Sequence, residues 1–529
     1  MGIYVSAGVY VKEKDISEII PNLSTTTGGI IGYSAKGDTT QLRLMTNTQQ
    51  FVQEYGEPVP GNYFHYSALA YLENGTKLYC KRVENGALYG GVKIKDSNSS
   101  QANIAIDAGA VTPDFVTVSG EDNLFYIYGV NPGIWNNTIG VRISSVDLVE
   151  YTFKIEVYFT DSEGVTTNVE TWTVSRQTKV DGYGKQLYLE DRINGFSDYI
   201  VVADDTTQGS TVLPKVQVTT LAVAQGSNGS DVTDADYVTG WDAFSNPDDV
   251  DVRVLINSGQ TGVTVQQKMK TIVEDRKDCI ALLDMPYAQL TSVSSMVSWR
   301  NDTQNFNSSY IALYSPWVKV YDPYNDKIVE IPPSGYVASQ IAYNDYVSEV
   351  WYAPAGLNRG IINVLGLTNV FTQGERDTLY ENGINPIQTF RGEGNVIWGQ
   401  KTEQVKASAL DRVNVRRLLI TLEKAISVAL RYFVFEPNSE VTRFRIVAMI
   451  ESYMDQLYAK GAFQSELGDK GYLVVCDATN NTPAVIDANE LHVDIFLKPS
   501  RAAEFIQLQT IITKSGASFT ELVARGINL

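Results

Sequence analysis

Side chains able to carry out proton transfer near neutral pH are scarce in this chain. Histidine, the residue most often used for that task, occurs only at His65 and His492. Two histidines are too few for a multi-histidine metal site and make a histidine-dependent catalytic site improbable. His492 stands in a stretch of alternating polarity, which indicates a structural position in a strand. The chain also lacks the Gly-x-x-x-x-Gly-Lys-Ser/Thr loop that holds nucleotide phosphates, so we predict no catalytic residue and no cofactor.

Thiols and carboxylates give no clear metal site either. Cys80, Cys279 and Cys476 are about 200 residues apart and outside any metal-binding motif, so we expect reduced, buried side chains. Carboxylates gather near the middle of the chain, at Asp231, Asp234, Asp236, Asp242, Asp248, Asp249 and Asp251. Their spacing is not that of a 12-residue calcium loop, and we interpret them as a solvated acidic face. Oxygen ligands alone leave a cation site open, but we predict no metal.

One locally basic region stands out in an acidic protein. The formal net charge is −19, which disfavours binding to a phosphate backbone. Arg412, Arg416 and Arg417 bring positive charge to one side of a predicted helix. Such a face is either ordinary helix solvation or a docking surface for an acidic partner. No segment reaches the roughly 18 consecutive apolar residues of a membrane span, and the N-terminus lacks a secretory signal, so we expect no membrane insertion.

The elements that would position these groups form several units. Apolar runs in residues 250–257, 278–284 and 308–316 alternate with helical patterns over about 263–276 and 290–301. Continuous apolar strands separated by helices predict a doubly wound parallel sheet buried on both faces. Residues 27–83 have the same mixed α/β character. Between about residues 84 and 226 the pattern changes to strands, most clearly at Tyr151–Phe159, which predicts an all-β insert.

The last third of the chain predicts an α+β unit. A helical stripe runs from Val415 to Phe433 and is stopped by Pro437, and a second helix covers about 442–460. Three strand candidates follow, in residues 471–477, 491–499 and 503–513. We divide the chain into 1–20 as an N-terminal arm, 21–90 as the first part of the core, 91–226 as the β insert, 227–390 as the α/β domain, 391–514 as the α+β domain, and 515–529 as a C-terminal arm.

Both ends of the chain resemble single strands without a core of their own. The candidate strand residues are Val9, Tyr10 and Val11 at one end and Phe519, Thr520, Glu521 and Leu522 at the other. An unpaired strand promotes aggregation in a monomer, but it gives specific polymerisation where a neighbour offers a sheet edge. Pairing within the same chain is the alternative.

Several segments in order along the chain resemble the phage tail sheath family. The opening SAGVYVKEKD is similar to its first strand, and NPGIWNNTIGVRI is similar to its NPG-x-W turn, with Asn136 where many members carry glycine. Further matches are DCIALLDMP, SSYIALYSPWVKVYDP, IPPSGYVAS, APAGLNRG, INPIQTFRGEGNVIWGQKT, DRVNVRRL, VVCDATNNTP and LKPSRAAEFIQL. The interior of the β insert is not covered. The ordered set is far more specific than any one segment.

This resemblance implies a structural subunit that forms hexameric rings stacked around a tail tube and contracts to drive the tube through the host envelope. The implied partners are other copies of the chain, the tail tube protein, baseplate proteins and tail terminator or neck proteins, in a virion tail assembled in the bacterial cytoplasm. Arg412, Arg416 and Arg417 would face the tube, and the insert would face outward. The family's middle domain is subtilisin-like, but this sequence has no histidine there for a catalytic triad.

Two alternatives remain open from the sequence. One is the sheath of a phage-derived injection machine, such as a bacteriocin or secretion apparatus, which a single subunit does not distinguish from a phage tail. The other is a hydrolase built on the doubly wound core. A hydrolase would need a nucleophile and a base in one pocket, and the sequence offers no such pair.

Overall fold

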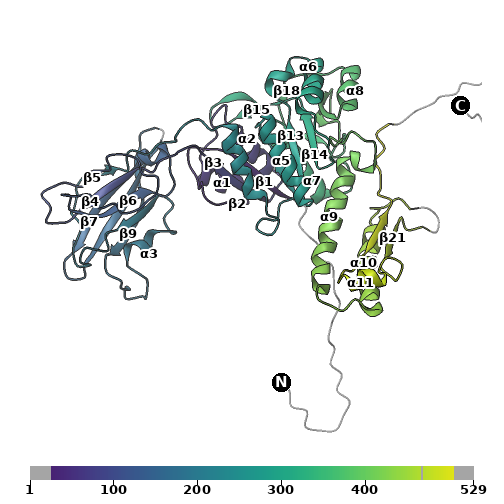
Figure 1. The fold of residues 1–529 in the computed structure, drawn as a ribbon. Coiled ribbons are helices and arrows are strands. Elements are labelled where there is room, and N and C mark those ends of the chain that lie inside the picture. Colours follow the sequence, from purple (N-terminus) through teal and green to yellow (C-terminus); the bar gives the residue numbers. More distant parts are fainter. Residues whose placement is uncertain (1–25, 162, 466–468, 506–529) are drawn as a thin grey trace, which may run out of the picture.

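The computed structural model describes residues 26–161, 163–465 and 469–505. The candidate arm strands at residues 9–11 and 519–522 lie outside the described residues. The centre of the molecule is a nine-stranded sheet (Figure 1). Its strands, in spatial order, are β17 (Ile361–Ile362), β20 (Gly394–Ile397), β19 (Ile384–Phe390), β14 (Ile311–Ser315), β13 (Ile280–Asp284), β12 (Val254–Ile256), β1 (Thr27–Tyr33), β3 (Lys77–Val83) and β2 (Arg43–Met45).

The six inner strands, from β19 to β3, run parallel. β2 pairs antiparallel with β3, β20 pairs antiparallel with β19, and the edge strand β17 pairs antiparallel with β20. Successive side chains of a strand point to opposite faces, and both faces of this sheet are buried. Ile30 and Ile31 of β1 are fully buried in two different hydrophobic clusters, one on each face. The predicted parallel sheet buried on both faces is therefore confirmed.

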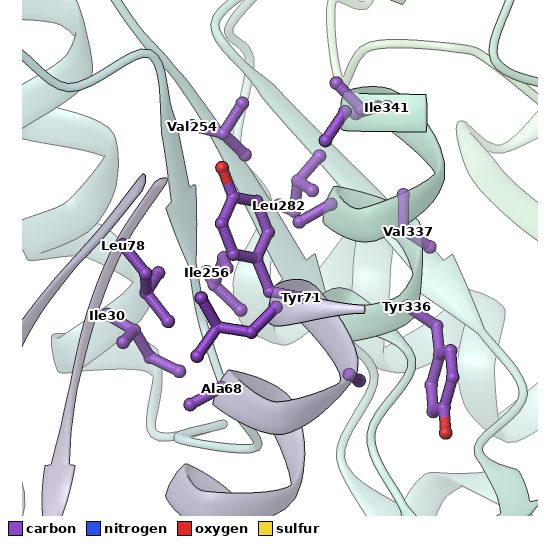
Figure 2. Packing of buried hydrophobic residues seen from close by; sticks show 14 of the residues in the cluster. Ile30, Ala68, Tyr71, Leu78, Val254, Ile256, Leu282, Tyr336, Val337 and Ile341 are labelled. Carbon is purple, nitrogen blue, oxygen red and sulfur yellow. The ribbon is translucent and has the colours of Figure 1, made fainter. Parts of the chain in front are cut away.

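Helices cover both faces of the sheet. One face packs against α1 (Thr48–Tyr55), α2 (Tyr63–Leu72) and α7 (Ser334–Val347). Figure 2 shows Ala68 and Tyr71 of α2 on the side of Ile30 of β1, and Val337 and Ile341 of α7 on the side of Leu282 of β13. The other face packs against α4 (Asp234–Trp241), α5 (Val263–Arg276), α6 (Val293–Ser298) and α8 (Gln373–Glu381). A small sheet of β15 (Val318–Asp322), β16 (Lys327–Ile331) and β18 (Gly366–Leu367) flanks this core.

Two antiparallel sheets form a separate β-sandwich between β3 and β12, seen at one end of the molecule in Figure 1. The first sheet is β10 (Ile200–Asp204), β6 (Asn123–Gly129), β4 (Gly91–Lys95) and β5 (Ile104–Ala105). The second is β11 (Leu221–Ala222), β7 (Ile139–Asp147), β8 (Thr152–Thr160) and β9 (Thr166–Ser175). Their inner faces share one hydrophobic cluster, to which the short helix α3 (Leu189–Ile193) also contributes. The strand-rich pattern of this region is confirmed.

The C-terminal part contains two long helices and a short sheet. These are α9 (Val413–Leu430), α10 (Glu440–Ala459), β21 (Tyr472–Val475), α11 (Pro483–Asp487) and β22 (Asp494–Leu497). The sequence placed the end of α9 near Pro437, but the α-helix ends at Leu430, and Phe435 has a left-handed backbone with φ 72°. The third strand candidate, residues 503–513, lies largely outside the described residues.

The helix expected over residues 290–301 is not continuous. A 3-10 turn at Tyr287–Thr291 is followed by α6 (Val293–Ser298) and then by a π-helical turn at Trp299–Gln304. The break occurs because Ser292 adopts an extended conformation and its side chain accepts a hydrogen bond from the backbone of Ser295, which starts a new helix. By contrast, α5 occupies Val263–Arg276, the range that the sequence predicts.

Candidate subunit-interaction surface

The sheet of β21 and β22 has open edges. Tyr472 pairs with Leu497 and Val475 with Asp494 in antiparallel register. Within the described residues, neither strand has a neighbour on its other side. A two-stranded sheet is marginal by itself, and an unpaired edge presents backbone donors and acceptors to any strand that arrives. This sheet is therefore a place where further strands can be added.

The two faces of this sheet differ in exposure. Val474 and Ile495 lie opposite each other and belong to the hydrophobic cluster of α9 and α10. Leu473 and Phe496, the next pair in the register, are 57% and 59% exposed. A large aliphatic and an aromatic side chain side by side on a solvent face are typical of a surface that another chain covers.

An apolar groove of about 510 Å³ lies between α9 and β22. Its strand wall is formed by Val493, Ile495 and Leu497. The helix side presents the apolar residues Leu419, Leu422, Ile426, Leu430 and Val434, and the polar residues Glu423, Ser427 and Arg431 also line it. An extended segment placed along β22 would gain main-chain hydrogen bonds and could place alternate side chains in this groove. The groove was not apparent from the sequence, because α9 and β22 are about 70 residues apart and only the helical stripe hinted at a buried face.

The predicted tube-facing arginines lie at the start of α9, and two of them make contacts inside the chain. Arg417 makes a two-armed ion pair with Asp345 of α7, with side chains 4% and 1% exposed. Arg416 is also buried; it places its guanidinium 4.2 Å from the ring centre of Tyr310 and donates to Ser309 Oγ at 2.7 Å. These two side chains therefore offer no exposed charge in this conformation.

Arg412 is the partly accessible member of the three. Its side chain is 23% exposed, and its guanidinium donates to both carboxylate oxygens of Glu504, at 2.7 and 2.8 Å. The three arginines thus do not form one exposed basic surface, contrary to what the sequence suggested. A tube-facing role at this helix stays a prediction, and in this conformation only Arg412 could carry it.

The acidic residues at 231–251 are dispersed among different partners. Asp236 caps α4 together with Thr233, Asp242 pairs with Lys268, and Asp251 pairs with Arg253. Across the described ranges, no group of three or more His, Cys, Asp or Glu residues is arranged to hold a metal ion. The three cysteines are free and buried, as the sequence predicted.

Neither histidine lies in a catalytic arrangement. His65 is buried on α2, where its Nε2 lies 3.2 Å from the carbonyl oxygen of Tyr55 and 3.4 Å from Ser34 Oγ. Burial lowers the pKa of His65 to about 4, and Ser34 Oγ already donates to the Tyr55 carbonyl oxygen. This pair belongs to the core. His492 lies just before β22 rather than within it, with Nε2 2.9 Å from Glu490.

Two buried carboxylates were missed by the sequence analysis. Asp284, at the end of β13, accepts hydrogen bonds from the backbone of Gly259 and from the backbone and hydroxyl of Ser334. Glu403 lies 3.7 Å from Arg300, and neither of its carboxylate oxygens has a hydrogen-bond partner. Burial raises the pKa of Asp284 to about 6 and that of Glu403 to about 7. Only three-dimensional packing reveals either site.

No helix within the described residues is long and apolar enough to span a membrane.

The doubly wound core, the added β-sandwich and the open-edged two-stranded sheet define a multidomain α/β fold. Comparison with known proteins makes this specific. Residues 230–403 match the model of the phage tail sheath protein central domain, and residues 405–513 match that of the phage tail sheath C-terminal domain. The chain belongs to the phage tail sheath family.

Similar proteins and structures agree with this assignment. The tail sheath protein of Enterobacteria phage T4 is 33% identical over 370 residues, which are 66% of this chain and 54% of that protein. That of Vibrio phage KVP40 is 34% identical over 313 residues, 54% of this chain and 46% of its own. The chain thus spans about half the length of these relatives.

Solved structures show the same fold over nearly the whole chain. A sheath tail protein of Listeria innocua has a TM-score of 0.58 at 11% identity and covers 90% of this chain and 95% of its own. The helical sheath of the anti-feeding prophage in the contracted state has a TM-score of 0.57 at 16% identity and covers 96% and 99%.

Proposed function

We propose that this chain is the subunit of a contractile tail sheath, which polymerises as stacked hexameric rings around a tail tube and shortens to drive the tube through the host envelope. The observation that carries the proposal is the open-edged sheet of β21 and β22 beside an apolar groove, in a chain of the sheath family. The role is structural, without enzymatic activity. The subunit works in the virion tail after assembly in the bacterial cytoplasm.

The partners follow from that role. They are other copies of this chain, the tail tube protein, baseplate proteins and the tail terminator or neck proteins. The middle domain, residues 227–390, takes the subtilisin-like form of the family, with helices on both faces of its parallel sheet supporting that reading. Contraction without a bound nucleotide requires an extended lattice trapped above a packing of lower free energy, so subunits must shift without separating.

Strand exchange meets this requirement. Residues 2–20 and 515–529 of one copy would add to the β21–β22 sheet of a neighbour, with their alternating apolar side chains in the groove beside α9. Main-chain hydrogen bonds in a shared sheet persist while the connecting segments absorb the rotation between subunits. The unpaired edges and the exposed Leu473 and Phe496 support this arrangement.

Deleting either arm tests the strand exchange. Both truncated chains should remain folded, soluble monomers, because the described residues form large hydrophobic clusters among themselves. Negative-stain electron microscopy and analytical ultracentrifugation would measure assembly. Normal polymer formed by a truncated chain would refute the proposal.

A substitution on the acceptor sheet gives a matched test. Phe496→Glu places a charge on the exposed face of β22 and should block assembly without lowering the melting temperature. Phe196→Glu, at a residue 73% exposed in the β-sandwich, is the control and should assemble normally. Equal behaviour of the two variants would exclude the β21–β22 face from subunit contact.

A tube contact through Arg412 needs a variant that spares its internal ion pair. Changing Arg412 to Glu and Glu504 to Arg together keeps the pair but reverses the direction of the charge. Loss of tube-templated assembly in the double variant would support the contact, and unaltered assembly would remove it. The triple change of all three arginines is unsuitable, because Arg417 is buried against Asp345.

A second candidate function is the sheath of a phage-derived injection machine. The fold is shared with the sheath of an extracellular contractile injection system, with a TM-score of 0.55 at 17% identity. The two functions use the same subunit chemistry and differ in the genes around them. Neighbouring genes for a capsid and a terminase would identify a phage tail, and their absence would favour the injection machine.

A further inference from the structure

The β-sandwich projects from one side of the core (Figure 1), and the turn NPGIW, residues 131–135, lies at the junction between them. The backbone of Gly133 donates to the carbonyl oxygen of Leu88 at 3.0 Å, and the backbone of Ile134 donates to Asn228 Oδ1 at 2.9 Å. Leu88 and Asn228 belong to the two segments that connect the sandwich with the core. The turn therefore lies beside both chain crossings, and the proposed sheath function assigns it no role.

The turn is a rigid part of the sandwich. Trp135 belongs to the hydrophobic cluster of the sandwich, and its Nε1 donates to the carbonyl oxygen of Asn131 at 3.2 Å. The buried Asn136 donates through Nδ2 to the same oxygen at 2.8 Å and accepts from the backbone of Gly90 at 2.9 Å. A Cβ on Gly129 would lie 2.3 Å from Asn136 Oδ1, so this side chain is also closely packed. The turn thus cannot shift without disturbing the packing of the sandwich.

The other side of the turn contacts the core. A Cβ on Gly133 would lie 2.4 Å from the carbonyl oxygen of Ala35, so the turn meets the loop after β1 backbone to backbone. Arg82, near the end of β3, is 1% exposed, and burial lowers its pKa to about 10. Its Nη1 donates to the carbonyl oxygen of Gly37 in the core at 2.9 Å and to that of Pro132 in the turn at 2.6 Å. One guanidinium nitrogen therefore joins the two units.

A lysine of the core makes a second contact of this kind. Lys36 Nζ donates to the carbonyl oxygen of Gln53 in α1 at 2.7 Å. The same atom lies 5.2 Å from the ring centre of Trp135 and 6.0 Å from that of Tyr199, both in the sandwich. Burial lowers the pKa of Lys36, which indicates that its ammonium group is partly desolvated between the units. The attraction between a cation and an aromatic ring is stronger when the pair is desolvated.

These contacts all depend on the orientation of the sandwich. Two connecting segments by themselves would let the sandwich swing, and relative motion is the usual behaviour of domains with a small interface. Here a rotation would separate the touching backbones, the shared guanidinium and the lysine from its rings. We infer that the NPGIW turn is a joint that fixes the direction in which the sandwich projects from the core, with Arg82 and Lys36 as its core side. The inference concerns one chain and does not rest on the proposed sheath function.

Double electron–electron resonance tests the joint through the distance between two nitroxide labels. The labels would be attached at Gln49→Cys on α1 and Thr173→Cys on β9, two exposed positions in the core and the sandwich. The three native cysteines are buried and should not react with the label. In the full-length chain, kept at a concentration where it is monomeric, we expect one narrow distance distribution. A broad distribution would overturn the inference.

A glycine substitution breaks the joint at the turn. Gly133→Ala places a Cβ against the backbone of Ala35 and should shift or broaden the distance distribution. Gly164→Ala, in the turn between β8 and β9, is the matched control. It introduces the same kind of strain at a positive φ, 81°, but the described residues leave open space around the new Cβ. The control should keep the narrow distribution of the parent protein.

A lysine substitution breaks the joint from the core side. Lys36→Met removes the ammonium group and should raise the population of other orientations about fivefold, whereas Lys77→Met, at an exposed position of β3, should not. Unchanged distributions in both Gly133→Ala and Lys36→Met would overturn the inference. Far-UV circular dichroism melts establish that each variant keeps its fold. If Gly133→Ala does not fold, Lys36→Met decides alone, and an unchanged distribution in that variant overturns the inference.

Discussion

The β-sandwich and the C-terminal part are both appended to the same core, but they are joined to it in different ways. The sandwich closes a hydrophobic cluster between its own two sheets. Its chain leaves and returns at one place, where Asn85 and Gly229 lie side by side in a parallel bridge. The C-terminal part has no such boundary, because α9 belongs to two clusters. Val413 and Ile420 pack in the core, whereas Leu418 and Leu422 pack against α10.

The sandwich is therefore a separate unit attached to the core, whereas the C-terminal part is a continuation of the core. A unit with its own core and a single point of exit can be removed or replaced with little effect on its host. A helix shared by two cores transmits any displacement of one to the other. We therefore expect the sandwich to be dispensable for the fold of the core, and the C-terminal sheet to move with the core as one body.

The largest effect is expected where α9 is anchored to α7. Arg417→Ala leaves Asp345 buried without its charge partner and should lower the free energy of unfolding by about 3–5 kcal/mol. Arg412→Ala removes a partly exposed pair and should lower it by about 1 kcal/mol or less. Urea denaturation followed by fluorescence measures both. Equal losses would contradict the view that α9 is anchored through the buried pair.

A cavity-forming substitution in the sandwich and one in the C-terminal part should destabilise different regions of the molecule. Ile155→Ala in the sandwich and Leu422→Ala in α9 each empty a buried site and should cost about 2–5 kcal/mol. In differential scanning calorimetry, the first should shift only a sandwich transition, and the second should shift the transition of the core. A common shift of all transitions by Ile155→Ala would show that the sandwich is not an independent unit.

The carboxylate of Glu403 lies just before α9 and makes stability depend on pH. Burial raises its pKa from 4.5 to about 7, so the folded state favours the protonated form. The contribution of this protonated carboxyl group to the free energy of unfolding is fully present below about pH 4.5. It is lost as the pH rises through 7, which lowers the free energy of unfolding by about 3 kcal/mol. Glu403→Gln should therefore match the wild type at pH 4 and exceed its stability at pH 8. Parallel urea-denaturation curves across this range would rule out the shifted pKa.

The smallest effect is expected from removing the sandwich. Replacing residues 87–226 with a short glycine linker joins two segments that already lie side by side. The melting temperature of the core should change by no more than about 4 °C. Polymerisation should also persist, since the sequence-based expectation places the insert outward. Loss of ring formation would give the sandwich a part in subunit contact.

Much of the core could be predicted from the sequence, because its signals are local. The apolar runs of β13 and β14 reflect burial on both faces of the sheet, and the helical pattern of α5 reflects burial on one face of the helix. Both patterns can be recognised without knowing which elements pack against them. The prediction of one continuous helix over 290–301 was wrong, because the N-cap at Ser292 starts a new helix instead of continuing the preceding turn. Periodicity alone does not report such a competition.

The interaction surface could be predicted only in part. Alternating residues at the chain ends suggested donor strands, but the acceptor sheet and its groove depend on the packing of α9 against β22. The arginines of α9 illustrate the limit. A basic stripe on a helix resembles a docking face, yet Arg416 and Arg417 point into neighbouring elements because the first half of α9 lies in the core. Helix orientation is a tertiary property, and the sequence of one helix does not contain it.

Negative-stain electron microscopy of the concentrated full-length chain, alone and with tubes of the cognate tail tube protein, tests the proposed sheath function most directly. Hollow cylinders with six-fold rings are expected, formed at least in the presence of tubes. Monodisperse monomers under both conditions would contradict this function.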